Sequence, residues 1–311
     1  MNRPRYYPYL VTGLIMAVFF GITTILLPRF NILDPLDLGR ASLILSAIQF
    51  TMTLLIIALM KRDQTYRLLE ERGIYFGRLF RPILAWLFIA LKFAAVFLVI
   101  SFFPEDVLQV NPSGLLTATV FALSIGLFEE FLFRGFLFKN LLIGRDERAV
   151  MTAALISSIL FGLFHIDFMM VSKGQLIGAQ LGLAWFAFGM GFYFAAVVYR
   201  YQKLWIPIVL HALVDVSTFY LIALIETDAL FDMLAPVLSV TDLGGTGSNS
   251  FLLAVGLVFL LFGFRMLRQT FSIRQSERLL REANGQESPD LEPSDVDDDT
   301  PQSASDPFDR A

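Results

Sequence analysis

The sequence predicts an all-α, polytopic membrane protein, a bundle of about eight transmembrane helices with both termini in the cytoplasm. Of its 311 residues, 56% are hydrophobic and 32 are phenylalanine, whereas soluble domains are roughly 45–50% apolar. Several apolar runs reach about 20 residues, the length that a helix needs to cross a hydrocarbon core of roughly 30 Å. Lys and Arg are concentrated in alternate segments between these runs, as expected for one fixed orientation in a membrane.

The apolar runs that predict transmembrane helices cover 9–27, 42–60, 82–103, 115–139, 149–169, 176–199, 204–226 and 249–268. With a cytoplasmic N-terminus, nineteen of the 24 Lys and Arg residues fall in cytoplasmic segments and three in outer segments. The largest basic group lies in the segment 61–81. Because Lys and Arg are enriched in cytoplasmic loops, this distribution places both ends of the chain in the cytoplasm.

The two ends of the chain carry opposite charge. The N-terminal stretch MNRPRYYPYL is basic and runs into an apolar span without a small-residue cleavage site, so we expect a retained first helix and no cleaved signal peptide. Residues 282–311 hold ten acidic side chains and one basic one, with little to bury, and predict a disordered tail. The chain contains no cysteine, which excludes disulfides and thiolate metal sites.

The apolar run FALSIGLFEEFLFRGFLF (121–138) carries three charged side chains, Glu129, Glu130 and Arg134. Each charge near the centre of a membrane helix costs about 2.5–3.5 kcal/mol, so their presence suggests a function. Glu130 and Arg134 are four residues apart and can pair along one helix face. Glu129 points about 100° away around the helix and has no partner within it. Glu129 is therefore the candidate general base.

The chain has two histidines, and both fall in predicted spans. Phe161 and His165 are four residues apart in FGLFH, as are His211 and Asp215 in HALVD, so each pair shares a helix face. We expect Asp215 to accept a hydrogen bond from His211 and so to fix the tautomer of its ring. Buried histidines and ion pairs can serve only to hold helices together, but polar residues drawn from three spans favour a functional site.

Two kinds of chemistry fit these residues, and both are hydrolytic. In the first, Glu129, His165 and His211 bind a zinc ion and leave one position open for water. In the second, Glu129 itself activates a water molecule against a substrate carbonyl, while the two histidines and Asp215 stabilise the attacked oxygen. The residues alone do not select between the two.

Three motifs in order resemble the signature of the CPBP family, which contains CAAX prenyl endopeptidases of the Rce1 type and the bacteriocin-processing and immunity proteins also called Abi. The family patterns are EExxxR, FxxxH and HxxxN or HxxxD. They match EEFLFR (129–134), FGLFH (161–165) and HALVD (211–215) without a gap. The resemblance covers about 115–216, roughly a third of the chain.

The resemblance implies an intramembrane endopeptidase whose site lies in a cavity within an eight-helix bundle. Glu129 would be the water-activating carboxylate, His165 and His211 would complete the centre, and Asp215 would take a place often held by Asn. The supporting residues that it implies are Glu130, Arg134 and Phe161. The added negative charge of Asp215 favours a metal or a shared proton at the site.

On this interpretation the chain has four parts. Residues 1–114 hold the first three spans and the basic loop 61–81, and residues 115–226 form the catalytic membrane core. Residues 227–272 hold an outer loop and the last span, and residues 273–311 form the acidic cytoplasmic tail.

Two features of the spans are not explained by the motifs. Counting 1.5 Å per residue from the cytoplasmic ends spreads His211, Glu129 and His165 over somewhat more than ~10 Å in depth. We expect helix tilt, or a break near His165 and Asp167, to bring them level. Lys92, in LAWLFIALKFAAVFL, either pairs with a carboxylate of the site or extends toward the membrane surface, and we favour a structural role.

We expect a multi-pass protease of the plasma membrane of a bacterium. Its partners would be the lipid bilayer and a membrane-bound peptide or protein, of CAAX type or a small peptide, and no nucleic acid. Zinc is the one cofactor that the residues suggest. The alternatives are a proton-coupled transporter, since buried Glu and His also form proton relays, and a non-catalytic immunity or scaffold protein. A transporter would need a substrate path and usually an internal repeat, and neither is visible in the sequence.

Overall fold

The computed structural model of the protein describes residues 6–27, 38–62, 79–102, 112–142, 147–166, 177–224 and 247–283. Nearly all of these residues are helical and none of them lies in a strand, which confirms the all-α prediction. The chain divides into two units, Met1–Arg268 and Gln269–Ala311. Every polar residue that the sequence marked as a site candidate lies in the first unit.

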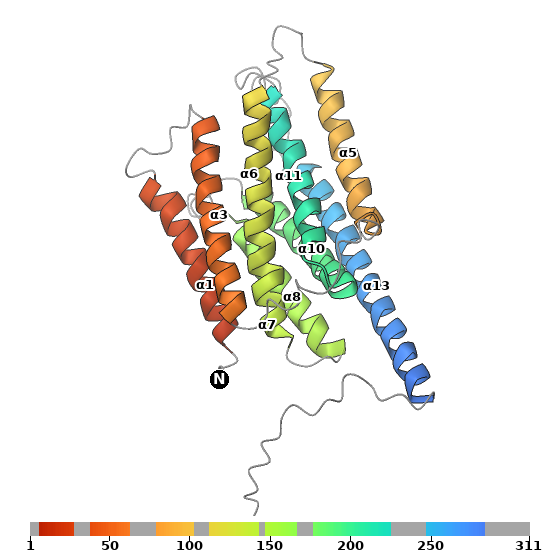
Figure 1. Ribbon diagram of the computed structural model, residues 1–311. Helices are drawn as coiled ribbons and strands as arrows, with labels where there is room; N and C mark the ends of the chain where they lie inside the picture. Colours follow the sequence, from red (N-terminus) through yellow and green to blue (C-terminus); the bar gives the residue numbers. More distant parts are fainter. Residues whose placement is uncertain are drawn as a thin grey trace, which may run out of the picture. The chain divides into compact units, whose positions relative to one another are not determined.

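The described residues form a series of helices (Figure 1). They are α1 (Tyr7–Phe20), the π-helix η1 (Gly21–Leu26), α3 (Leu38–Arg62), α5 (Ile83–Ile100), α6 (Pro112–Glu130), the π-helix η4 (Phe131–Phe138), α7 (Lys139–Leu141), α8 (Glu147–Phe164), α10 (Ile177–Tyr201), α11 (Trp205–Leu224) and α13 (Gly247–Ala283). α6, η4 and α7 follow one another without interruption. α13 begins in the first unit and ends in the second.

Among the described residues, seven helices are long and apolar enough to cross a membrane. The longest is Pro112–Leu141, of 30 residues, where the sequence predicted 115–139. The predicted span 204–226 corresponds to α11, whose apolar stretch Trp205–Leu221 is shorter than the others. These helices confirm a polytopic helical bundle and a multi-pass membrane protein.

α6 packs against α3 and against α11, and it lies between them in Figure 1. α8 packs against α10, and α5 packs against α11. The three sequence motifs lie at the end of α6, at the end of α8 and in α11. The helix that carries the two glutamates is therefore in direct contact with the helix that carries the HALVD motif.

A glycine sets the distance between α6 and α11. A Cβ atom on Gly126 would lie 3.0 Å from the carbonyl oxygen of Ile208 and 3.1 Å from the amide nitrogen of Ala212. The two backbones thus approach more closely than larger residues would permit, as is common where small residues meet in membranes. Gly126 lies one turn before Glu130 and Ala212 directly follows His211, so this contact brings the first and third motifs together.

Several predictions fall on residues that the structure does not describe. Residues 63–78 of the basic loop, the outer loop 227–246 and the acidic tail from 284 onward lie outside the described residues. Residues 273–283, which the sequence assigned to the disordered tail 273–311, are instead helical and form the end of α13. The boundaries between the four predicted parts therefore stay predictions, as does the cytoplasmic location of both termini.

The orientation of the chain can be tested with single cysteines. Because the chain contains no cysteine, one introduced thiol is the sole target of a maleimide reagent that cannot cross membranes. We expect Thr65→Cys, in the basic loop, to be labelled only from the cytoplasmic side and Ser172→Cys, between two predicted spans, only from the outside. The reverse labelling pattern would contradict the orientation derived from charge.

Candidate active site

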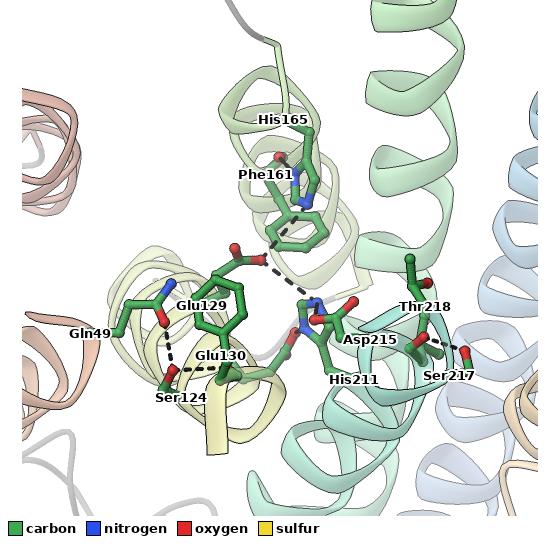
Figure 2. A network of polar contacts seen from close by, with 12 residues as sticks. Gln49, Ser124, Glu129, Glu130, Phe161, His165, His211, Asp215, Ser217 and Thr218 are labelled. Carbon is green, nitrogen blue, oxygen red and sulfur yellow. Dashed lines mark hydrogen bonds and ion pairs between the residues drawn. The ribbon is translucent and has the colours of Figure 1, made fainter. Parts of the chain in front are cut away.

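Three helices bring the carboxylates and both histidines into one cluster (Figure 2). Glu129 lies at the end of α6, His165 directly follows the end of α8, and His211 lies in the first half of α11. Glu129 Oε2 is 3.8 Å from His165 Nε2 and 3.7 Å from His211 Nε2. The structure thus brings together the three residues that the sequence assigned to a catalytic centre.

His165 lies directly after the end of α8. The helix ends at Phe164 and His165 lies in a turn. The amide nitrogen of His165 donates to the carbonyl oxygen of Gly162 at 3.1 Å, three residues back, as in the tight last turn of many helices. The break expected near His165 is present, and Asp167 lies outside the described residues.

Phe161 orients the ring of His165 through both its backbone and its side chain. Nδ1 of His165 donates a hydrogen bond to the carbonyl oxygen of Phe161 at 2.8 Å. The two rings meet edge to face with centroids 4.6 Å apart. Because a carbonyl oxygen only accepts, Nδ1 carries the hydrogen and Nε2 is left facing Glu129. Phe161, predicted as a supporting residue, therefore lies directly against the cluster.

The hydrogen-bond partner of His211 is Glu130, whereas the spacing predicted Asp215. His211 Nδ1 lies 2.9 Å from Glu130 Oε1. Asp215 Oδ2 is 3.6 Å from His211 Nε2, beyond hydrogen-bond range. The spacing of four residues does place Asp215 on the face of His211, but the close approach of α6 and α11 at Gly126 puts Glu130 nearer. The prediction failed because it considered only partners within one helix.

Glu130 also forms the predicted pair with Arg134. Arg134 Nη1 donates to Glu130 Oε1 at 3.0 Å, and neither side chain has any exposed surface. The same carboxylate oxygen accepts from His211 Nδ1. One oxygen atom of Glu130 therefore joins the buried ion pair of one segment to the histidine of another helix.

The segment directly after Glu130 is the π-helix η4, which the sequence analysis did not predict. A π-helix has i→i+5 hydrogen bonds and wider turns, and such segments occur frequently at functional sites. Ser157 of α8 donates its hydroxyl hydrogen to the carbonyl oxygen of Phe133 at 2.9 Å. The guanidinium of Arg134 lies over the ring of Phe161, 4.1 Å from its centroid. Both contacts attach η4 to α8, the helix that ends directly before His165.

The cluster is closed on one side and accessible on the other. Side-chain exposure is 0% for Glu130 and Arg134, 2% for His211, 9% for Glu129, 21% for His165 and 23% for Asp215. Within the described part of the chain, the accessible edge of the cluster is therefore the one with His165 and Asp215. Glu129 lies between this edge and the buried pair.

Gly191 of α10 leaves the space that Arg134 and Phe161 occupy, and sequence reasoning did not identify it. A Cβ atom on Gly191 would lie 2.7 Å from Arg134 Nη2 and 2.9 Å from Phe161 Cδ1. We expect Gly191→Ala to displace both side chains and to lower the free energy of unfolding by about 1–3 kcal/mol. Thermal unfolding in detergent measures the effect. Gly13→Ala is the control because nothing lies within 4 Å of its added Cβ, and equal stability of the two variants would contradict the argument.

The cluster contains the kinds of side chain that bind zinc in proteins. Glu129, His165 and His211 are zinc ligands in kind, and hydrogen bonds at both Nδ1 atoms are typical of histidines that bind metals through Nε2. However, no group of three or more His, Cys, Asp or Glu side chains among the described residues is arranged to hold a metal ion. The zinc site therefore stays a prediction from the sequence.

Residues 111–217 match the model of the family described as type II CAAX prenyl endopeptidase Rce1-like. The match includes all three motifs and agrees with the range predicted from them, which confirms the resemblance. No curated protein and no solved structure matches the chain. The family match supports an intramembrane endopeptidase of the CAAX type as the general class of activity.

Proposed function

We propose that residues 111–217, which match the Rce1-like family model, form an intramembrane endopeptidase in which Glu129 activates a water molecule. The observation that carries the proposal is the position of Glu129 Oε2, which is 3.8 Å and 3.7 Å from the Nε2 atoms of His165 and His211. This oxygen has no hydrogen-bond partner among the described residues. It is therefore available to accept a proton from water.

The proposed reaction begins as Glu129 takes a proton from the water while the water oxygen attacks the peptide carbonyl carbon. The carbonyl oxygen becomes negatively charged and requires hydrogen-bond donors. In its protonated form, His211 donates from Nε2 to this oxygen while Nδ1 stays bonded to Glu130. Glu129 then passes the proton to the leaving nitrogen, the C–N bond breaks, and the products are a carboxylic acid and an amine.

The remaining polar residues hold His211 in place for this reaction. Glu130 accepts from Nδ1 at 2.9 Å, and Asp215 lies 3.6 Å from Nε2 on the accessible side. Arg134 neutralises Glu130 within the closed part of the cluster. These contacts on both sides of the imidazole limit its rotation.

We propose a membrane-bound peptide or protein as the substrate, of CAAX type or a small peptide, and the plasma membrane of a bacterium as the location. No nucleic-acid partner is proposed. The long apolar helices support a substrate presented within or beside the bilayer. An active site surrounded by hydrocarbon would limit bulk water to the small amount that the polar cluster admits.

The test of this proposal compares peptide ends in membranes that express wild type or Glu129→Gln at equal levels. We expect new peptide ends in the wild-type sample alone, which would establish proteolysis and identify the substrate together. Identical peptide ends, with both proteins folded and abundant, would overturn the proposal and favour a transporter or a non-catalytic scaffold.

Removal of metal distinguishes the two hydrolytic mechanisms. Because the proposed mechanism uses Glu129 itself as the base, we expect cleavage to continue at an unchanged rate after treatment with EDTA and gel filtration. The same preparation is analysed for bound zinc. Loss of activity that zinc restores would contradict this prediction and assign Glu129, His165 and His211 as metal ligands.

A further inference from the structure

Lys92 lies in α5, outside the matched residues 111–217, on a helix that packs against α11. Its ammonium group does not extend toward a membrane surface. Nζ donates to the carbonyl oxygen of Val214 at 2.6 Å and to the hydroxyl of Thr218 at 2.8 Å. These acceptors lie on the turn of α11 that directly follows His211.

The carbonyl of Val214 belongs to the interior of α11. Such a carbonyl ordinarily accepts one hydrogen bond, from the amide of the residue four positions later. Ser217 of the same helix also donates its hydroxyl hydrogen to this carbonyl at 2.8 Å. Lys92 adds a further bond from another helix and so fixes this turn from outside. The fixed turn carries Asp215, whose Oδ2 lies 3.6 Å from His211 Nε2 and has no hydrogen-bond partner among the described residues.

Lys92 also acts on Asp215 through its charge. Nζ binds the carbonyl of the residue directly before Asp215, so a protonated Lys92 places a positive charge near the Asp215 carboxylate across the contact between α5 and α11. A charged lysine inside hydrocarbon is costly, and a neutral side-chain amide, with two N–H donors, could donate two hydrogen bonds without that cost. The charge is therefore the property of Lys92 that needs an explanation, and Asp215 supplies one.

We propose that Lys92 is a positioning residue for the reaction at Glu129. It holds the turn 214–218 of α11 and places a positive charge beside Asp215, so that the Asp215 carboxylate stays directed at His211 Nε2. Lys92 itself contacts neither the substrate nor the attacking water. This role rests on the proposed function, because it describes how one edge of the catalytic cluster is maintained.

The first test measures kcat and KM on a farnesylated CAAX peptide with a fluorophore and a quencher on opposite sides of the scissile bond. We expect Lys92→Met to lower kcat about tenfold, the effect typical of residues that orient a functional group, with KM unchanged. Lys92→Arg should restore much of the rate because it keeps the charge. Thr218→Val is the control, since it removes one acceptor and leaves the charge in place.

A double variant separates a role through Asp215 from a general loosening of the bundle. In an Asp215→Asn background the carboxylate charge is absent, so Lys92→Met should reduce kcat much less than it does in the wild type. Equal reductions in both backgrounds would overturn the proposal. So would a rise in KM with kcat unchanged, because that result would assign Lys92 to substrate binding.

The second test does not depend on activity. The chain has two histidines, so nitrogen-15 labelling of histidine gives NMR signals from two rings only. We expect Lys92→Met to shift the ring signals of His211 and to leave those of His165 in place. Unchanged signals, or equal shifts of both rings, would contradict the proposal. If His211 alone shifts but the wild type cleaves no peptide, the contact is supported and the proposed function fails.

Discussion

Replacement of Glu129 by glutamine is expected to abolish peptide cleavage and to leave the protein folded. The substitution keeps the size of the side chain but removes its ability to take a proton from water, and loss of a general base typically lowers a rate roughly 10²–10⁴-fold. Glu129 Oε2 makes no hydrogen bond within the described part of the chain, so the substitution breaks no such bond there. Cleavage rate and thermal unfolding are measured on the same detergent preparation.

Glu147→Gln is the matched control for this experiment. Glu147 is an exposed residue in the first turn of α8, so the same chemical change at that position should alter neither cleavage nor stability. Full activity of Glu129→Gln beside an active control would contradict the assignment of Glu129 as the base. Unfolding of Glu129→Gln would show instead that its charge holds the cluster together.

Replacement of Glu130 by alanine is expected to destroy both stability and activity. Arg134 has no exposed surface, so the substitution leaves a buried charge without its partner, which costs about 3–5 kcal/mol. It also removes the acceptor of His211 Nδ1 and frees the ring to turn. The free energy of unfolding and the cleavage rate should therefore fall together.

Glu130→Gln separates the loss of the negative charge from the loss of the hydrogen-bond acceptor. Its amide oxygen can still accept hydrogen bonds, but its charge no longer neutralises Arg134, so we expect an intermediate stability. Unfolding in detergent across the series of wild type, Glu130→Gln and Glu130→Ala measures the difference. A fully active and well-folded Glu130→Ala variant would contradict the role given to the ion pair. Replacement of Glu129 is thus expected to affect cleavage alone, whereas replacement of Glu130 is expected to affect both cleavage and stability.

The contacts that could be predicted from the sequence are those within one helix. Spacing by four residues correctly paired Glu130 with Arg134 and placed Phe161 beside His165, because helix geometry fixes such neighbours. The same rule failed for His211. Its partner Glu130 lies 81 positions away in the chain, and it comes close only because Gly126 lets two helices approach.

Features that depend on helix endings and on other helices were also missed or left open. A count of 1.5 Å per residue spread Glu129, His165 and His211 in depth, whereas Glu129 Oε2 lies 3.8 Å and 3.7 Å from the two histidine Nε2 atoms. The π-helical turns of η4 depend on outside support such as the bond from Ser157 to the carbonyl of Phe133. Nothing near Lys92 in the sequence indicates that its ammonium group meets α11.

The one-sided exposure of the cluster constrains the shape of a substrate. The edge with His165 and Asp215 is accessible, while His211 and Glu130 are buried behind it. A peptide in an intact helix has its carbonyl oxygens bonded to its own amides and its backbone wrapped in side chains. Such a peptide cannot place a bare carbonyl carbon next to Glu129. If the proposed function holds, cleavage therefore requires an unwound stretch or a frayed chain end, and we expect a stable transmembrane helix to remain uncut.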